Sequence, residues 1–346
     1  MQRVLSLKYV LYLTFVIMLF TLLFIKNVNV EPIEIGAIRQ ILHPQDLKGE
    51  LTYDPHRHYD YIFAFVAKQL GYINNFTDLA KSFWFIEILL WMAALIKLCN
   101  YIFKDDKTVL TITIMLFLLS LSGQTDQKTM IMPLYFLSIY YFLKGKWLPA
   151  ALWGGFMFYL HIGMAMWWFL TSFFALFPIL LINKKVSVRQ IIKYSLGVIL
   201  TGFPIIYFYL TRGEGMDSFS INYYYYVCWD TISIALFLHK GPVLILRISL
   251  MIGVFLIGYY KAKKQGYNMD NIMPIAIGVL IIYVLSFIFA DLLRNGAFLT
   301  LQFLRAIEYD QLFSNLLFEF LLAEQIKKYN YIFPSKLPTA NCFVVY

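Results

Sequence analysis

The sequence predicts an all-α, polytopic transmembrane helical bundle. The chain has 346 residues, of which 60% are hydrophobic, 19% are aromatic and only 14% are charged. Soluble domains carry about 25% charged residues, so this composition is typical of a protein dissolved in lipid. Apolar stretches of roughly 20 residues, the length that crosses a bilayer core of about 30 Å as a helix, recur between short polar breaks. Because spanning backbone groups must be hydrogen-bonded within their own helix, open sheet is excluded.

The apolar windows predict about ten membrane spans. The first, near 6–26, is long for a signal-peptide core and has no small-residue cleavage site, so we expect it to be retained. The later windows are 81–103, 108–122, 129–144, 147–162, 164–182, 190–210, 241–260, 271–291 and 297–323. Because no repeat, low-complexity tract or Gly/Ser linker separates them, residues 1–346 are predicted to form a single integral membrane domain.

The basic residues predict the orientation of these spans. With this set of spans they fall in small clusters on one side of the membrane, which is expected to be cytoplasmic and to hold both termini. The clusters are Arg3 and Lys8, Lys104 and Lys107, Lys144 and Lys146, Lys184 to Lys193, Lys261 to Lys264, and Lys327 to Lys336. The net charge of +9 is therefore interpreted as a topology signal and an attraction to lipid phosphates, not as a nucleic-acid surface.

Two longer polar segments are predicted to be extracytoplasmic. The first, 27–80, carries many ionisable residues and a short apolar turn, so we expect one or two helices there that lie on the membrane surface. The second, 217–240, contains four consecutive tyrosines followed by Trp229 and suits the aromatic belt at the headgroup level. If 217–240 were a further span, the lysines that follow 260 would lie on the outer side.

The sequence lacks the motifs that would indicate several common functions. The three cysteines, Cys99, Cys228 and Cys342, are scattered and indicate neither a disulfide framework nor a zinc site. No Walker loop, dinucleotide-binding glycine motif, G-x-S-x-G or H-E-x-x-H is present. ATP hydrolysis and dinucleotide chemistry are therefore not expected.

The first polar segment holds most of the residues that could carry chemistry. It includes three of the five histidines and several carboxylates between His43 and Asp60. A carboxylate there could act as a general base on an acceptor hydroxyl, while Lys48, Arg57 and a histidine could neutralise a lipid-linked phosphate leaving group. A hydrated loop that is merely polar is the alternative for any single one of these residues.

A metal site in this segment is left open by the sequence. The spacing of His56 and His58 with Asp54 and Asp60 could indicate a metal, but two histidines one residue apart are a weak indication without a strand or helix that fixes both side chains. Oxygen ligands from Asp46, Glu50 or Asp54 could instead hold a hard divalent cation, Mg²⁺ or Mn²⁺, that bridges a phosphate. No cofactor is required by the pattern.

Ionisable residues within the predicted spans are candidates for function, because each costs several kcal/mol at the bilayer centre unless it faces a polar interior. Arg305 and Glu308 share one face of the last predicted helix, where they could pair only with each other or Arg305 could bind a phosphate. His161 could be a packing histidine or line a site. The full set is Glu87, His161, Arg247, Arg305, Glu308, Asp310 and Glu319.

Three short motifs resemble those of the GT-C fold membrane glycosyltransferases. The run His43-Pro44-Gln45-Asp46-Leu47-Lys48-Gly49-Glu50 is similar to the family's N-P-x-x-[aromatic or Leu]-x-G-D loop pattern, with histidine and glutamate in place of asparagine and aspartate. Gly154, Gly155 and His161 resemble a small-residue stretch before a histidine, and Gln302 with Arg305 resembles a late Gln-x-x-Arg. The family also shares the large first external loop.

The resemblance implies a polyprenyl-phosphate-linked sugar as donor and a lipid or glycan as acceptor, used on the outer face of a bacterial plasma membrane. Glu50 or Asp46 would be the base, and the other site residues would bind substrate: Lys48, Arg57, His43, His161 and Arg305. The change from aspartate to glutamate shifts the carboxylate by about one methylene, which leaves the base unassigned between the two acids.

Three alternatives remain at this point. A polymerase of lipid-linked repeat units would need the same kind of loop. A secondary transporter or flippase would show inverted repeats or matched broken helices, and no such pair is apparent around Pro133, Pro178, Pro204 and Pro274. A non-catalytic scaffold would scatter its polar residues. Convergence of Glu50, His161 and Arg305 on one external cavity would favour the transferase.

Overall fold

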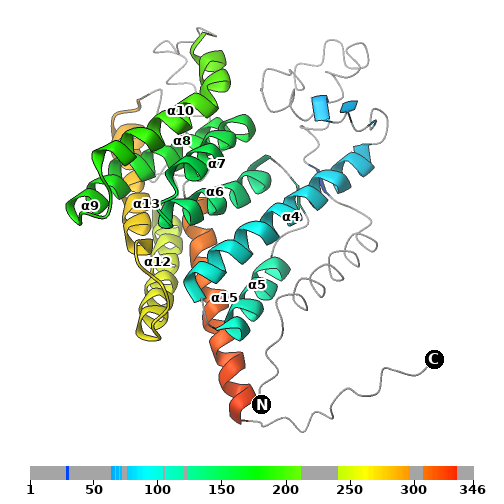
Figure 1. Cartoon of the computed structure of the whole chain (residues 1–346), viewed down its shortest axis with the longest axis vertical. Coiled ribbons are helices and arrows are strands. Elements are labelled where there is room, and N and C mark those ends of the chain that lie inside the picture. Colours follow the sequence, from blue (N-terminus) through cyan, green and yellow to red (C-terminus); the bar gives the residue numbers. More distant parts are fainter. Residues whose placement is uncertain are drawn as a thin grey trace.

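The computed structural model describes nearly two-thirds of the chain (Figure 1). The described residues are 29–30, 64–66, 68–69, 71, 76–103, 106–120, 124–125, 127–211, 241–295 and 307–332. They are almost entirely helical, with one parallel pair of two-residue strands. The predicted first span at 6–26 and the predicted interfacial segment 217–240 lie outside the described residues, as does most of 27–80.

The described helices follow most of the apolar windows. The α-helices are α4 (Phe76–Phe103), α5 (Lys107–Ser120), α6 (Gln127–Leu143), α7 (Trp147–Leu160), α8 (Ile162–Leu170), α9 (Phe177–Ile182), α10 (Val188–Thr211), α12 (Gly241–Lys264), α13 (Ile272–Ser286) and α15 (Ile307–Ile332). Two π-helical segments, η2 (Thr171–Leu176) and η3 (Phe287–Leu292), continue α8 and α13 without a break. The last window, predicted at 297–323, overlaps α15, which continues beyond it to Ile332, while 297–306 lie outside the described residues.

Five stretches of helix are long and apolar enough to cross a membrane: Phe85–Phe103, Ile162–Ile182, Val188–Tyr207, Ile245–Lys264 and Ile272–Leu292. Lys107–Leu118, Met130–Leu143 and Trp147–Leu160 are shorter apolar helices. This set indicates an integral membrane protein. The helices α10 and α12 expose large apolar side chains, as helices that face lipid do, including Leu200 at 71% and Leu250 at 62%. The total of about ten spans stays a prediction.

Aromatic side chains and one serine bind α6, α7 and α8 together. The Trp168 indole N–H donates to Ser138 Oγ at 2.8 Å, and Ser138 Oγ donates to the carbonyl of Ala150 at 2.9 Å. Tyr135 meets Trp168 edge to face, with ring centroids 5.1 Å apart. On the other side of α7, α10 approaches so closely that a Cβ on Gly155 would lie 2.4 Å from Thr201 Cβ. The small residues of α7 therefore permit backbone contact between these helices.

The connections after α4, α9 and α12 meet at one end of the bundle. Lys185 Nζ donates to Asn271 Oδ1 at 3.1 Å, and the backbone N–H of Asn268 donates to the carbonyl of Ile102 at 2.9 Å. The end of α6 joins them, because the Tyr101 hydroxyl donates to the carbonyl of Leu143 at 3.3 Å. We call this the lysine-rich end. It consists of 106–107, 144–146, 183–193 and 261–271 with the C-terminal part of α15.

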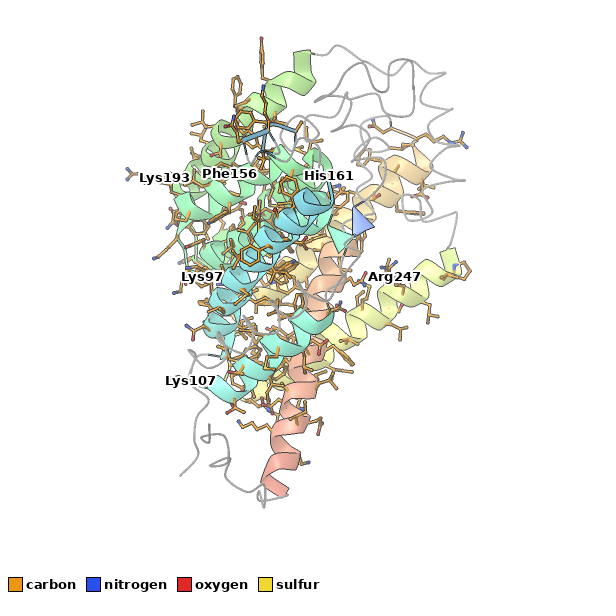
Figure 2. The ribbon with its side chains drawn as sticks, turned by 90° about the vertical axis from the view of Figure 1, so that its right-hand side faces the viewer. Lys97, Lys107, Phe156, His161, Lys193 and Arg247 are labelled. Atoms are coloured by element: carbon orange, nitrogen blue, oxygen red, sulfur yellow. The ribbon has the colours of Figure 1, made fainter. Side chains whose placement is uncertain are left out.

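The strand pair lies at the opposite end of the bundle. Strand β1 (Asn29–Val30) pairs in parallel with β2 (Gln124–Thr125), which packs against α4 and α6. Because α5 begins at the lysine-rich end and leads away from it toward β2, the strands lie away from that end, on the side of the bundle where Figure 2 labels His161. The predicted first loop, 27–80, is thus attached near its start to this far end.

Candidate functional site

Of the site residues that the sequence predicts, the structure describes only His161. The other six lie outside the described residues: Glu50, Asp46, Lys48, Arg57, His43 and Arg305. Their convergence with His161 on one cavity therefore stays a prediction. The side chains of Glu308 and Asp310, on the first turn of α15, also lie outside the described part.

His161 forms the break between α7 and α8. Its backbone is extended (φ −156°, ψ 106°), and its N–H still donates to the carbonyl of Met157 at 3.0 Å. Its Nδ1 accepts the backbone N–H of Met164 at 3.3 Å and so caps the start of α8. The 14 residues of α7 span about 21 Å at 1.5 Å per residue. His161 therefore lies in the half of the bundle away from the lysine-rich end.

Arg247 is a described cation near the start of α12, at the end of that helix away from its lysines. It lies about 9 Å along that helix from its first residue, at 1.5 Å per residue, and inside the candidate span Ile245–Lys264. Its guanidinium is half-buried and donates to the side-chain carbonyl of Gln311 on α15. Within the described part of the chain, Arg247 makes no ion pair. One amide acceptor leaves most of the five guanidinium donors available to a ligand.

Packing of α12 against α15 fixes the position of Arg247. The two helices run parallel, because contacts between them advance together along both sequences. One turn beyond Gln311, the hydroxyl of Ser314 donates to the carbonyl of Met251 at 3.0 Å. Figure 2 shows Arg247 and His161 toward one side of the bundle, with Lys97, Lys107 and Lys193 along the other side. The described far-end polar groups are therefore separated from the lysines.

Three carboxylates are buried in the described helices. Glu87 is in α4, Asp291 is in η3 and Glu319 is in α15. The sequence singled out Glu87 and Glu319 but missed Asp291, because the predicted window ended on that residue. The sequence did contain a signal for Asp291, because this residue is the first charged side chain after the uncharged apolar run 272–290.

Carboxylates at the lysine-rich end are held in a polar network with a structural role. Asp106 accepts hydrogen bonds from Lys327, from the Tyr267 hydroxyl at 3.0 Å and from the backbone N–H of Val109 at 3.1 Å. The same hydroxyl lies 3.3 Å from Glu324 Oε1. Partial burial alone would raise the pKa of Asp106, but the hydrogen bonds and the Lys327 charge outweigh it, and the pKa is lowered. Asp106 is thus a charged anchor rather than a proton-transfer group.

No group of three or more histidine, cysteine, aspartate or glutamate side chains that could hold a metal occurs among the described residues. The oxygen ligands predicted for Mg²⁺ or Mn²⁺ all belong to the first loop, outside that part of the chain.

Compared with known proteins, the chain matches no family model, no curated protein and no solved structure. Any assignment of function therefore rests on the chain's own residues.

Proposed function

We propose that this chain is a membrane glycosyltransferase that transfers a sugar from a polyprenyl-phosphate-linked donor to a lipid or glycan acceptor. The observation that carries the proposal is the half-buried Arg247, which lies inside a candidate span and has the Gln311 amide as its described partner. A cation at this depth costs several kcal/mol unless an anion joins it. The phosphate of a lipid-linked donor is such an anion, and it enters from the membrane itself.

The position of β1, near the start of the predicted first loop, supports a site at the same end of the bundle. The strand pair attaches Asn29 and Val30 at the end away from the lysines, where His161 and Arg247 also belong. In the proposed reaction the acceptor oxygen bonds to the anomeric carbon of the donor sugar as the bond from that carbon to the phosphate oxygen breaks. Glu50 or Asp46 takes the acceptor proton, and the phosphate leaves as an anion. Arg247 would stabilise that charge together with the predicted Lys48, Arg57 and Arg305.

The orientation belongs to the proposal as well. If the lysine-rich end faces the cytoplasm, as the distribution of basic residues favours, the proposed site faces the outside of the cell. Glycan assembly at the cell surface then provides acceptors on the correct side.

A secondary transporter of a lipid-linked or small polar substrate is the second candidate. The π-helical segments η2 and η3 favour it, because helix interruptions within spans are frequent at substrate sites. The two lie in different spans, and α13, which leads into η3, packs directly on η2 with Gly278 against Thr171.

Transfer of radiolabelled sugar from a polyprenyl-phosphate donor pool into lipid-extractable or polymeric glycan tests the proposal. Membranes carrying the wild type would be compared with Glu50→Gln, Arg305→Ala and Arg247→Ala at matched expression. We expect each variant to lose about 100- to 1000-fold in rate, the range for removing one charge-stabilising group. Arg189→Ala, which removes an exposed charge at the lysine-rich end, should retain the wild-type rate.

Incorporation that is unaffected by all three site variants would refute the proposed site. If the wild type incorporated no sugar from any donor pool, the secondary transporter would become the preferred hypothesis. Uptake of labelled substrate into vesicles carrying the protein would then be the deciding measurement.

A further inference from the structure

Two lysines converge on one tyrosine ring where α4 and α6 reach the lysine-rich end. Lys97 Nζ lies 5.6 Å from the centroid of the Tyr140 ring and 5.7 Å from that of Tyr141. Lys144 Nζ lies 5.0 Å from the Tyr140 centroid. The two ammonium nitrogens are therefore at most 10.6 Å apart, the sum of their distances to that centroid. We call this group the α4–α6 lysine pair.

The α4–α6 lysine pair lacks a carboxylate among the described residues. Both lysines are exposed, and each makes cation–π contacts but no ion pair within the described part. Lys327 at the same end is instead neutralised by Asp106. Two like charges held near one aromatic ring repel each other, and an anion that contacts both would offset that repulsion.

Lys97 belongs to a helix segment that contacts lipid. It falls inside the candidate span Phe85–Phe103, six residues or about 9 Å from the end of α4, so its chain must extend toward the headgroups. On the same helix face, toward the bilayer centre, lie the exposed apolar residues Ile86, Leu89 and Ala93. Lys97 can therefore reach the depth of the lipid phosphates. The apolar strip of Ile86, Leu89 and Ala93 lies toward the bilayer centre, where an acyl chain can pack against it.

We propose that an anionic phospholipid binds here, with its phosphate between Lys97 and Lys144 and an acyl chain along the exposed strip of α4. The Tyr140 ring contacts both ammonium groups and so limits where they can lie. The site differs from the glycosyl-transfer site in position, since it lies at the lysine-rich end, and its occupant is a structural lipid of that leaflet.

The test reconstitutes the full chain into nanodiscs of phosphatidylcholine with and without phosphatidylglycerol, and measures the thermal unfolding midpoint. We expect phosphatidylglycerol to raise the wild-type midpoint. Lys97→Gln with Lys144→Gln should lose more than half of that rise, and the corresponding double arginine variant should keep it. Lys193→Gln with Lys264→Gln removes two exposed charges from the same end and should also keep it. Lipid that co-purifies in detergent should fall at least threefold in the first variant alone.

Equal losses in both glutamine variants would show general charge attraction and overturn the site. An unchanged rise in the Lys97 and Lys144 variant would overturn it too. Inorganic phosphate added to phosphatidylcholine nanodiscs should not reproduce the stabilisation, and a comparable rise would show that the site takes free phosphate rather than lipid.

Discussion

Gly258 lies at a close approach of α12 to α15. A Cβ at this position would lie 2.7 Å from the Cβ of Leu317 and 3.4 Å from its carbonyl oxygen. Neither atom is the flexible end of a side chain, so the helices themselves would have to move. A Cβ on Gly253, in the same helix, would meet no atom within 4 Å. The same residue type therefore has different roles at two points of one helix.

Gly258→Ala is expected to destabilise the protein by about 1–3 kcal/mol, the usual cost of overpacking a close contact. Gly253→Ala is the matched control and should be neutral or slightly stabilising, because alanine favours helix over glycine by about 1 kcal/mol. Thermal unfolding in one detergent, followed through tryptophan fluorescence, measures both. Equal midpoints for the two variants would contradict the contact.

Two buried serines differ in their hydrogen bonding: one links several helices, and the other makes no hydrogen bond. Ser138 accepts from Trp168 and donates to the backbone of α7, so it links three helices. Ser286, where α13 passes into η3, is equally buried, but its hydroxyl has no hydrogen-bond partner in the described structure. We expect Ser138→Ala to cost about 1–3 kcal/mol, because it leaves the Trp168 indole N–H unsatisfied.

Ser286→Ala removes the same atom without removing a hydrogen bond, and should change stability little or increase it. Comparing the two unfolding midpoints tests the assignment. If Ser138→Ala were as stable as wild type, the three-helix link would have no energetic role.

Hydropathy predicted where most helices lie, but it did not predict all of their boundaries or the two π-helical segments. Lipid requires apolar runs of a fixed length, so the windows that contain α4 to α13 were found from hydropathy alone. The last window ended too early, at 323, because Glu324, Lys327 and Lys328 interrupt the apolar pattern, whereas α15 continues to Ile332. The π-helical segments were not predicted, since neither η2 nor η3 contains a proline or glycine that would mark an interruption of the helix.

The sequence identified candidate residues of the site by their charge or ionisable side chain, but not the contacts that those residues make. Arg247 and His161 were recognisable because ionisable residues are rare in apolar runs. Their roles depend on neighbours far away in sequence or on backbone conformation: Gln311 lies 64 positions from Arg247, and His161 caps a helix that begins one residue later. No pattern within a single window carries that information.

At the scale of the whole molecule, the Asp106 network joins the chain's early and late helices. Its lowered pKa means that the charged form stabilises the fold. This contribution is complete above the unfolded value of about 3.9, and it is lost as pH falls from there through the lower folded value. Burial and the neighbouring carboxylates raise the pKa of Tyr267, so the neutral hydroxyl is favoured and this contribution is lost in strong alkali.

The expected result is that wild type and Asp106→Asn differ in unfolding midpoint at neutral pH and converge as pH falls below about 4. Lys327→Gln should remove part of the same difference. A difference that persisted unchanged to pH 2 would show that the Asp106 charge does not stabilise the fold.

The two ends of the bundle should also face opposite sides of the membrane. With the native cysteines replaced, Lys263→Cys and Gln124→Cys should react with a membrane-impermeant maleimide from opposite faces of oriented vesicles. We expect Lys263→Cys to react from the cytoplasmic face, because basic segments are retained there. Labelling of both from one face would reject the orientation.

The contact between α5 and α15 affects how the protein is made. Helix α5 ends at Ser120, whereas α15 begins at Ile307. At about 5–20 residues per second, translation needs on the order of 10 to 40 s to deliver the later helix. Until then, α5 lacks its contacts with α15, and the Asp106 carboxylate lacks its ion pair with Lys327. A chain that ended before residue 307 would leave that face of α5 without α15, so we expect incomplete copies to be degraded faster than the full chain.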